Sequence, residues 1–262
     1  MFEIARFEME RQRTAALTIS IGLAVYAMLF LAIGPEMVAE IDMSQYVQAL
    51  PEGFTRAFGL EAMTGFAGLM AAELYQFGWV ILLGLYSAYA AGRLVSREVE
   101  RGRMDLLLSN PVSRTRLLIE KYLSLFQTFL MVNLVVGVTV YFGSMIVDES
   151  LAFSNVAMVH LLSIPYFLAT ASIGLLFSTL FSREDLSRRS AIGVVFGLFM
   201  VETLVAGTDY AFLGKLSPTW YYDPTEILVH GSYDLAGAGI LLGVAMVLVA
   251  ASVLYFREKD LE

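Results

Sequence analysis

The sequence predicts an all-α protein that crosses a membrane six times, as a single domain over residues 1–262. Hydrophobic residues make up 58% of the chain and the mean hydropathy is +0.68, whereas an ordinary soluble domain is about 45–50% apolar. Six segments are almost free of charged side chains, and each approaches the roughly 20 residues that a membrane-spanning helix needs. We therefore expect a polytopic protein whose main surroundings are a lipid bilayer.

The predicted spans cover approximately residues 14–35, 74–93, 120–147, 156–181, 190–208 and 235–256. Gly34 and Pro35 are expected to end the first span. Pro165 is expected to kink the fourth, where neighbouring helices can satisfy the carbonyl that it frees. Between the first two spans, apolar residues recur every three to five positions and predict helices lying on the outer face: Phe54, Phe58, Met63, Phe66, Met70 and Leu74.

Basic residues gather on one side of this arrangement. Fifteen of the 17 Lys and Arg residues fall in the N-terminal segment, the segment between spans two and three, the 183–189 loop and the C-terminus, and only Arg56 and Lys215 fall on the other side. Because short cytosolic loops are enriched in Lys and Arg, we expect both termini in the cytosol and the protein in the cytoplasmic membrane. The net charge of −8 gives no indication of nucleic-acid binding.

The longest charged segment between two spans covers residues 93–121 and carries seven of the 17 basic residues. Gly102 permits a tight bend, and Pro111 suits the first position of a new helix. Four apolar residues lie between these two positions: Met104, Leu106, Leu107 and Leu108. The pattern predicts helix, bend, short apolar-faced helix, bend and helix. Exposed leucines beside a membrane are unfavourable, so we expect this short helix to dock on another protein.

The segment reads E-x-E-x-G-x-x-D-L-L-L-S-x-P-V-S-R, which resembles the cytosolic coupling segment of ABC-2 type transporter permeases. The resemblance is carried by Glu98, Glu100, Gly102, Asp105, Leu106, Leu107, Leu108, Ser109, Pro111, Val112, Ser113 and Arg114. The sequence GLLFSTLFSR at residues 174–183 and the ending YFREKDL at residues 255–261 are similar to two further patterns of the same family. Many family members have Thr where Arg103 stands, a small or apolar residue in place of Asn110, and Arg in place of Lys259.

The resemblance implies the membrane subunit of an ABC exporter. Two such subunits, as a homodimer or a heterodimer, would surround a central path. Each would seat its coupling helix on an ABC ATPase subunit, a separate polypeptide that binds the ATP, so this chain would hold no cofactor. Residues 1–13 would form an interfacial helix leading into the first span. The residues implied in ATPase contact are Glu98, Glu100, Gly102, Met104, Asp105, Leu106, Leu107, Leu108, Pro111, Ser113 and Arg114.

Two helix starts are predicted between spans five and six. Ser217 precedes Pro218, and Asp223 precedes Pro224, with Glu226 placed as in a capping box. The resemblance implies short outer or re-entrant helices at this position; the alternative is an ordinary outer loop.

Several polar or small residues fall inside the predicted spans. Gln127 and Asn133 in the third span must face protein or a cavity, and helix–helix hydrogen bonding is favoured over a translocation path. Glu202 is the one carboxylate within a predicted span, and it either lines a polar path or lies at the outer interface because the span ends early. Gly193 and Gly197 form a small-xxx-small pair that would let another helix approach closely.

Catalytic chemistry has few candidate residues. His160 and His230 are the only histidines and cysteine is absent, so no HExxH motif, disulfide or thiolate metal site exists. A phosphate-binding loop is also missing, because Leu216 follows Gly214-Lys215 and Asp209 stands where the first glycine belongs. We therefore predict no catalytic residues, no metal site and an ATPase on another chain.

Two other functions remain open at the level of sequence. A six-span sensor or assembly factor would use the same segment to bind a cytosolic partner without moving a solute. A secondary carrier would use Glu202 as its proton site. A polytopic membrane enzyme is the least favoured class. Nothing in the sequence ranks drugs, antibiotics, lipids or polysaccharides as the substrate.

Overall fold

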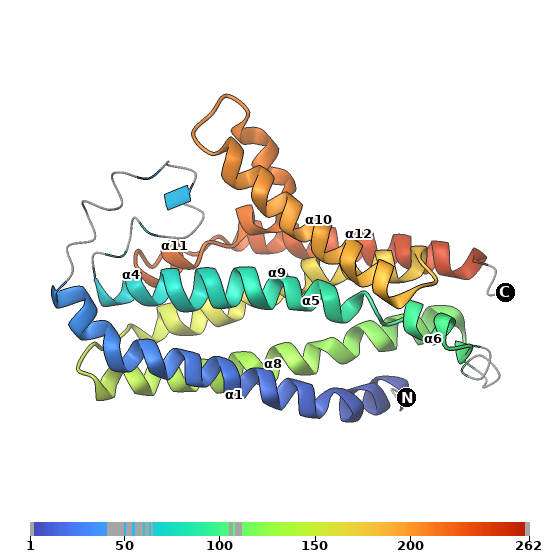
Figure 1. The fold of residues 1–262 in the computed structure, drawn as a ribbon, viewed down its shortest axis with the longest axis horizontal. Helices are drawn as coiled ribbons and strands as arrows, with labels where there is room; N and C mark the ends of the chain where they lie inside the picture. The colour runs from blue at the N-terminus through green and yellow to red at the C-terminus, as the bar shows by residue number, and fades with distance from the viewer. Residues whose placement is uncertain are drawn as a thin grey trace.

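The computed structural model describes residues 3–40, 50, 54, 55, 60, 63, 65–104, 107 and 112–259. Throughout these residues the regular structure is helical and contains no strand. Five helices are long and apolar enough to cross a membrane. Both ends of the chain lie at the same end of the bundle as the short helix α6, Ser96–Glu100 (Figure 1).

The first helix, α1, runs without a break over Glu3–Glu40, so the expected end at Gly34 and Pro35 is wrong. Pro35 lacks an N–H and removes one hydrogen bond close to the end of a long helix, which the remaining bonds tolerate. Gly34 has a packing role instead, because a Cβ there would lie 3.0 Å from the Leu69 side chain and 3.1 Å from that of Phe66.

The N-terminal turns of α1 do not form a separate interfacial helix, so that expectation is also wrong. They pack along α8, Arg114–Ile146. The carboxylate of Glu120 accepts hydrogen bonds from the backbone N–H groups of Ile4 and Ala5, at 3.0 and 3.2 Å, and Gln12 donates to Ser124 at 3.1 Å. These contacts satisfy free N–H groups of the first turn and hold α1 in line with the bundle.

The second membrane helix is continuous over residues 66–91 and consists of α4 (Phe66–Met70), the wide-turned η2 (Ala71–Leu83) and α5 (Gly84–Ala91). It begins earlier than the predicted residue 74, because Phe66, Met70 and Leu74 are buried in the core rather than lying on the outer face. Phe58 lies outside the described residues.

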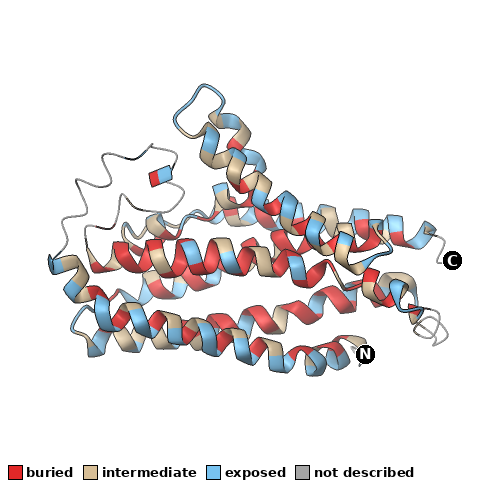
Figure 2. Cartoon of the chain, viewed as in Figure 1, coloured by how far each residue is buried: buried red, intermediate tan, exposed pale blue. Residues whose placement is uncertain are grey.

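Helix α9, Phe153–Leu180, is the central element of the bundle. It continues through Pro165 and packs against α5, α8, α10 and α12. Its buried face is the most extensive of the long helices after the second membrane helix, whereas α12, Leu235–Glu258, is largely exposed (Figure 2). The outer side of α12 is therefore an apolar surface that the rest of the described chain does not cover.

Helix α10, Glu184–Val205, covers most of the predicted fifth span, although it is not one of the five membrane-crossing candidates. Its buried residues recur every four positions and form a single narrow face: Ser187, Ala191, Val195 and Phe199. Beyond that face, α10 leaves the bundle at an angle (Figure 1). A Cβ at Gly193 or Gly197 would meet nothing within 4 Å, so this pair contacts no other helix in the described chain.

Three short helices follow α10: η3 (Ala211–Leu216), η4 (Pro218–Tyr221) and α11 (Pro224–Leu228). The last two begin at the two predicted starts, whereas η3 was not predicted. The Ser217 hydroxyl accepts a hydrogen bond from the Thr219 N–H at 3.4 Å. The Asp223 carboxylate accepts from the N–H groups of Thr225 and Glu226, at 2.8 and 3.2 Å. Both predicted caps are confirmed.

Candidate functional site

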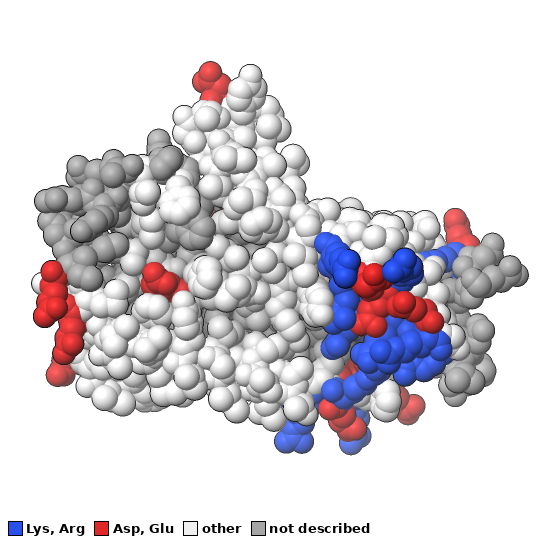
Figure 3. All heavy atoms as spheres, in the orientation of Figure 1, with Lys and Arg blue, Asp and Glu red and all other residues white. Residues whose placement is uncertain are grey.

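The segment between α5 and α8 lies at the end of the bundle where basic side chains gather. On the face shown in Figure 3, Lys and Arg are concentrated near α6, whereas the opposite end carries Asp and Glu. Most of the predicted ATPase-contacting residues belong to the described part of the chain. Four of them lie outside it: Asp105, Leu106, Leu108 and Pro111.

The beginning of this segment is attached to the end of α9. The buried Ser178 hydroxyl accepts hydrogen bonds from the backbone N–H groups of Val95 and Ser96, at 2.9 and 3.1 Å. These two N–H groups open α6 and have no partner within the helix, so Ser178 acts as a cap supplied by another helix. The resemblance at residues 174–183 included Ser178, but its partner could not be read from the sequence.

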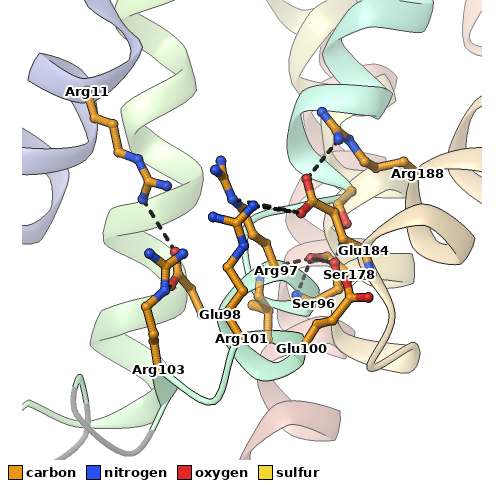
Figure 4. A network of polar contacts seen from close by, with 12 residues as sticks. Arg11, Ser96, Arg97, Glu98, Glu100, Arg101, Arg103, Ser178, Glu184 and Arg188 are labelled. Carbon is orange, nitrogen blue, oxygen red and sulfur yellow. Dashed lines mark hydrogen bonds and ion pairs between the residues drawn. The ribbon is translucent and has the colours of Figure 1, made fainter.

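A second set of contacts joins α6 to the start of α10 (Figure 4). The Glu100 carboxylate accepts a hydrogen bond from the Glu184 N–H at 2.8 Å. In return, the Glu184 carboxylate lies 3.8 Å from Arg97, 4.0 Å from Arg101 and 2.7 Å from Arg188. A negative charge in the first turn of a helix is favourable, so Glu184 both stabilises α10 and binds α6 to it. Sequence analysis missed Glu184.

Glu98 is directed into the protein rather than toward solvent. Its carboxylate lies 3.4 Å from Arg11, 3.0 Å from Arg103 and 3.6 Å from Lys121, and Lys121 also pairs with Glu8. The side chains of Glu98, Lys121 and Glu8 are 7%, 2% and 8% exposed. This buried network joins α1, α6 and α8. Because both carboxylate oxygens of Glu98 lie beside cations of this chain, Glu98 is not positioned to bind a partner protein.

The predicted bend at Gly102 is confirmed. Its φ of +61° lies in the left-handed region, which glycine adopts without steric cost. After the bend, Met104 is buried in the core at 3% exposure, and Leu107 packs partly against the same core. Met104 therefore anchors the segment to the bundle.

The end of the segment caps the start of α8 and is attached to the C-terminal end of α12. The Ser113 hydroxyl caps α8 by accepting from the Arg116 N–H at 3.2 Å. Arg114 donates to the carbonyls of Phe256, Arg257 and Lys259, at 3.2, 3.3 and 2.7 Å. These are carbonyls at the end of α12, where a cation is favourable.

Lys259 makes the equivalent contact with α9, because its Nζ donates to the Thr179 carbonyl at 2.7 Å. Partial burial lowers the pKa of Lys259 below its usual range. The similarity of residues 255–261 to the family ending thus has a structural explanation: the backbone of residues 256–259 accepts hydrogen bonds from Arg114 of the charged segment.

The polar residues of the third span differ in their surroundings. The buried Asn133 side chain lies 3.0 Å from His160 Nδ1 and accepts from the Ser163 hydroxyl at 2.9 Å, while His160 Nε2 lies 3.0 Å from the Tyr75 hydroxyl. These bonds connect η2, α8 and α9, which is the helix–helix role that the sequence favours for Asn133. Gln127 is partly exposed.

Glu202 lies three residues before the end of α10, the helix that leaves the bundle at an angle. It forms a hydrogen bond with the Thr219 hydroxyl and lines a cavity of about 320 Å³. Trp220, Tyr221 and Tyr222 line the same cavity, and burial raises the pKa of Tyr222 well above its usual range. Three further carboxylates complete its acidic wall: Asp223, Glu226 and Asp234. Among the described residues, no group of three or more acidic or histidine side chains is arranged to hold a metal ion.

The fold and the site define a multi-pass helical membrane protein in which one charged segment is joined to several of the long helices. A family model described as ABC-2 family transporter protein matches residues 4–261. This match covers nearly the whole chain, so the chain belongs to the ABC-2 transporter family of ABC transporter permeases, which are membrane subunits generally without catalytic activity of their own. No curated protein matches the chain.

Proposed function

We propose that this chain is the membrane-spanning permease subunit of an ABC exporter, driven by ATP hydrolysis on a separate ATPase polypeptide. The observation that supports this proposal most directly is the attachment of the charged segment, residues 93–121, to α1, α9, α10 and α12. A force applied to the segment would be transmitted to these four helices at once. Rigid-body movement of packed helices is a common way to couple one site to another.

The proposed topology has six spans, with α10 as the fifth and the termini and α6 in the cytosol. The gathering of Lys and Arg at that end supports this orientation. Helix α10 begins with charged residues, so its apolar part is shorter than that of the other five helices. It also leaves the bundle at an angle.

The residues of the segment divide into two groups in this proposal. Glu98, Met104 and Arg114 face the bundle and hold the segment in place. Leu106, Leu108 and the exposed part of Leu107, which also packs partly against the core, supply the apolar contact with the ATPase, and Asp105 supplies a polar one. Glu100 is exposed and also accepts a hydrogen bond from α10, so it can both hold the segment in place and contact the ATPase.

Two permease subunits would pair around the transported substrate, as a homodimer or a heterodimer. Gln127 and Glu202 stay candidates for the translocation path, because Gln127 is partly exposed and Glu202 lines a cavity. Asn133 is less suited to this role, since its amide is engaged by His160 and Ser163.

Substitution of both Leu106 and Leu107 by aspartate is expected to abolish co-purification of the cognate ATPase while leaving membrane insertion intact. Two carboxylates in an apolar contact would have to be desolvated without partners, which is strongly unfavourable. The measurement is the molar ratio of ATPase to permease after affinity purification.

The matched control is Leu186→Asp, an exposed leucine in the first turns of α10 at the same end of the bundle. This variant should keep the parent ratio. An unchanged ratio in the double variant would contradict the coupling assignment. ATP-dependent transport in vesicles that contain the ATPase separates the exporter from a sensor or assembly factor. Dependence on a proton gradient, lost in Glu202→Gln, would favour a secondary carrier.

A further inference from the structure

A cavity of about 500 Å³ lies between α1, α5 and α8 at the end of the bundle that carries α6. Helix α1 packs along α8 and meets the second membrane helix mainly at α4 and η2, so it stands apart from α5. The volume falls within the range of about 300–1,000 Å³ that is typical of ligand pockets. The hydrogen bonds and ion pairs that attach the charged segment to the other helices do not by themselves explain a cavity of this size.

Positive charge is in excess on the wall of this cavity. Its two carboxylates, Glu8 and Glu98, are both paired with Lys121. Arg93 also lines the cavity and forms no ion pair with any described residue. The Nε of Arg97 is buried without a hydrogen-bond acceptor, although the Glu184 carboxylate lies 3.8 Å away.

The guanidinium groups also act on one another. Partial burial of Arg97 and then the charges of Arg11 and Arg101 lower its pKa below the usual range; Glu184 opposes this effect, and Arg93 adds to it. Arg11 and Arg93 line the same cavity as Arg97. An anion bound among these three guanidinium groups would relieve this repulsion.

The other part of the cavity leads to an apolar surface. Thr14 and Thr18 of α1 line the cavity. Ile21, Val25 and Met28 continue the same helical face at three- and four-residue steps, and they are 58%, 56% and 50% exposed. A basic pocket thus opens directly onto an exposed apolar strip of α1.

We propose that this cavity binds the phosphate of an anionic membrane phospholipid, with Arg93 and Arg97 as its main ligands and its acyl chains along the exposed face of α1. The planar guanidinium group matches a phosphate through two parallel hydrogen bonds. Free phosphate offers the same head-group chemistry, but it would make no use of the apolar strip. The inference does not depend on the proposed transport function.

The test uses the full chain in detergent and titrates phosphatidylglycerol and phosphatidylcholine under native mass spectrometry. The parent should bind phosphatidylglycerol about tenfold more tightly than phosphatidylcholine, and the double variant Arg93→Gln with Arg97→Gln should lose this preference. Thr18→Trp should weaken binding of both lipids, because it fills the apolar side of the cavity and removes no charge.

The control is Arg183→Gln with Arg189→Gln, which removes two exposed charges at the same end of the bundle and should keep the preference. Thermal unfolding of each variant shows whether it is folded. Equal binding of the two lipids by the parent, or an equal loss in the control, would overturn the proposal. Displacement of phosphatidylglycerol by millimolar inorganic phosphate would overturn the lipid assignment, and resistance to displacement supports it.

Discussion

Replacement of Lys121 by methionine is expected to lower the free energy of unfolding by about 3 kcal/mol, the lower end of the range for removing one partner of a buried ion pair. Lys121 is 2% exposed and faces the buried carboxylates of Glu8 and Glu98. Methionine fills the space without the charge, so both carboxylates would stay buried with less compensation. Arg11 and Arg103 remain beside them, which limits the loss. Denaturant titration in detergent micelles measures the change in the free energy of unfolding.

Two further variants make this prediction specific. Lys121→Met combined with Glu8→Gln should recover most of the stability, because it removes one of the unpaired charges. Arg6→Met breaks the exposed pair between Arg6 and Glu10, whose side chains are 84% and 66% exposed, and should cost less than about 1 kcal/mol. Equal stability of Lys121→Met and the parent would show that the buried network does not hold α1 against α8.

The sequence predicts the long helices well because membrane burial imposes a simple requirement. A helix in lipid satisfies all its own backbone hydrogen bonds, so apolar length alone indicates a span. The bend at Gly102 and the cap at Asp223 were equally predictable, since each depends on one local residue type. Five of the six predicted spans correspond to helices that meet the length and composition of a membrane crossing.

The direction in which charged residues face was not predictable. The pattern around Glu98 indicated contact with a partner, but its carboxylate is bound by Arg11 and Lys121, which are distant in the sequence. Such pairs depend on how three helices pack, and no local pattern encodes that. The predicted end of α1 is wrong for a related reason: the rule that proline ends a helix is local, whereas Gly34 packs against Phe66 and Leu69 of the second membrane helix.

Gly174→Ala is expected to reduce the free energy of unfolding by about 1–3 kcal/mol, the usual cost of overpacking a core. A Cβ at Gly174 would clash with the Ala88 carbonyl oxygen and lie 2.9 Å from its carbonyl carbon. Both atoms belong to the backbone of α5, so no side-chain rotation can relieve the clash and α5 must move away from α9.

Movement of α5 would also reach the charged segment, because Ser178 lies one turn beyond Gly174 and caps the first N–H groups of α6. The matched control is Gly193→Ala in α10, where a Cβ meets nothing within 4 Å of the described chain. Its stability should stay within about 0.5 kcal/mol of the parent. Unfolding of purified single chains in detergent compares the two variants. Equal stability of Gly174→Ala and the parent would contradict the close packing of α5 against α9. It would also contradict the expected effect of this packing on the contact between Ser178 of α9 and the charged segment.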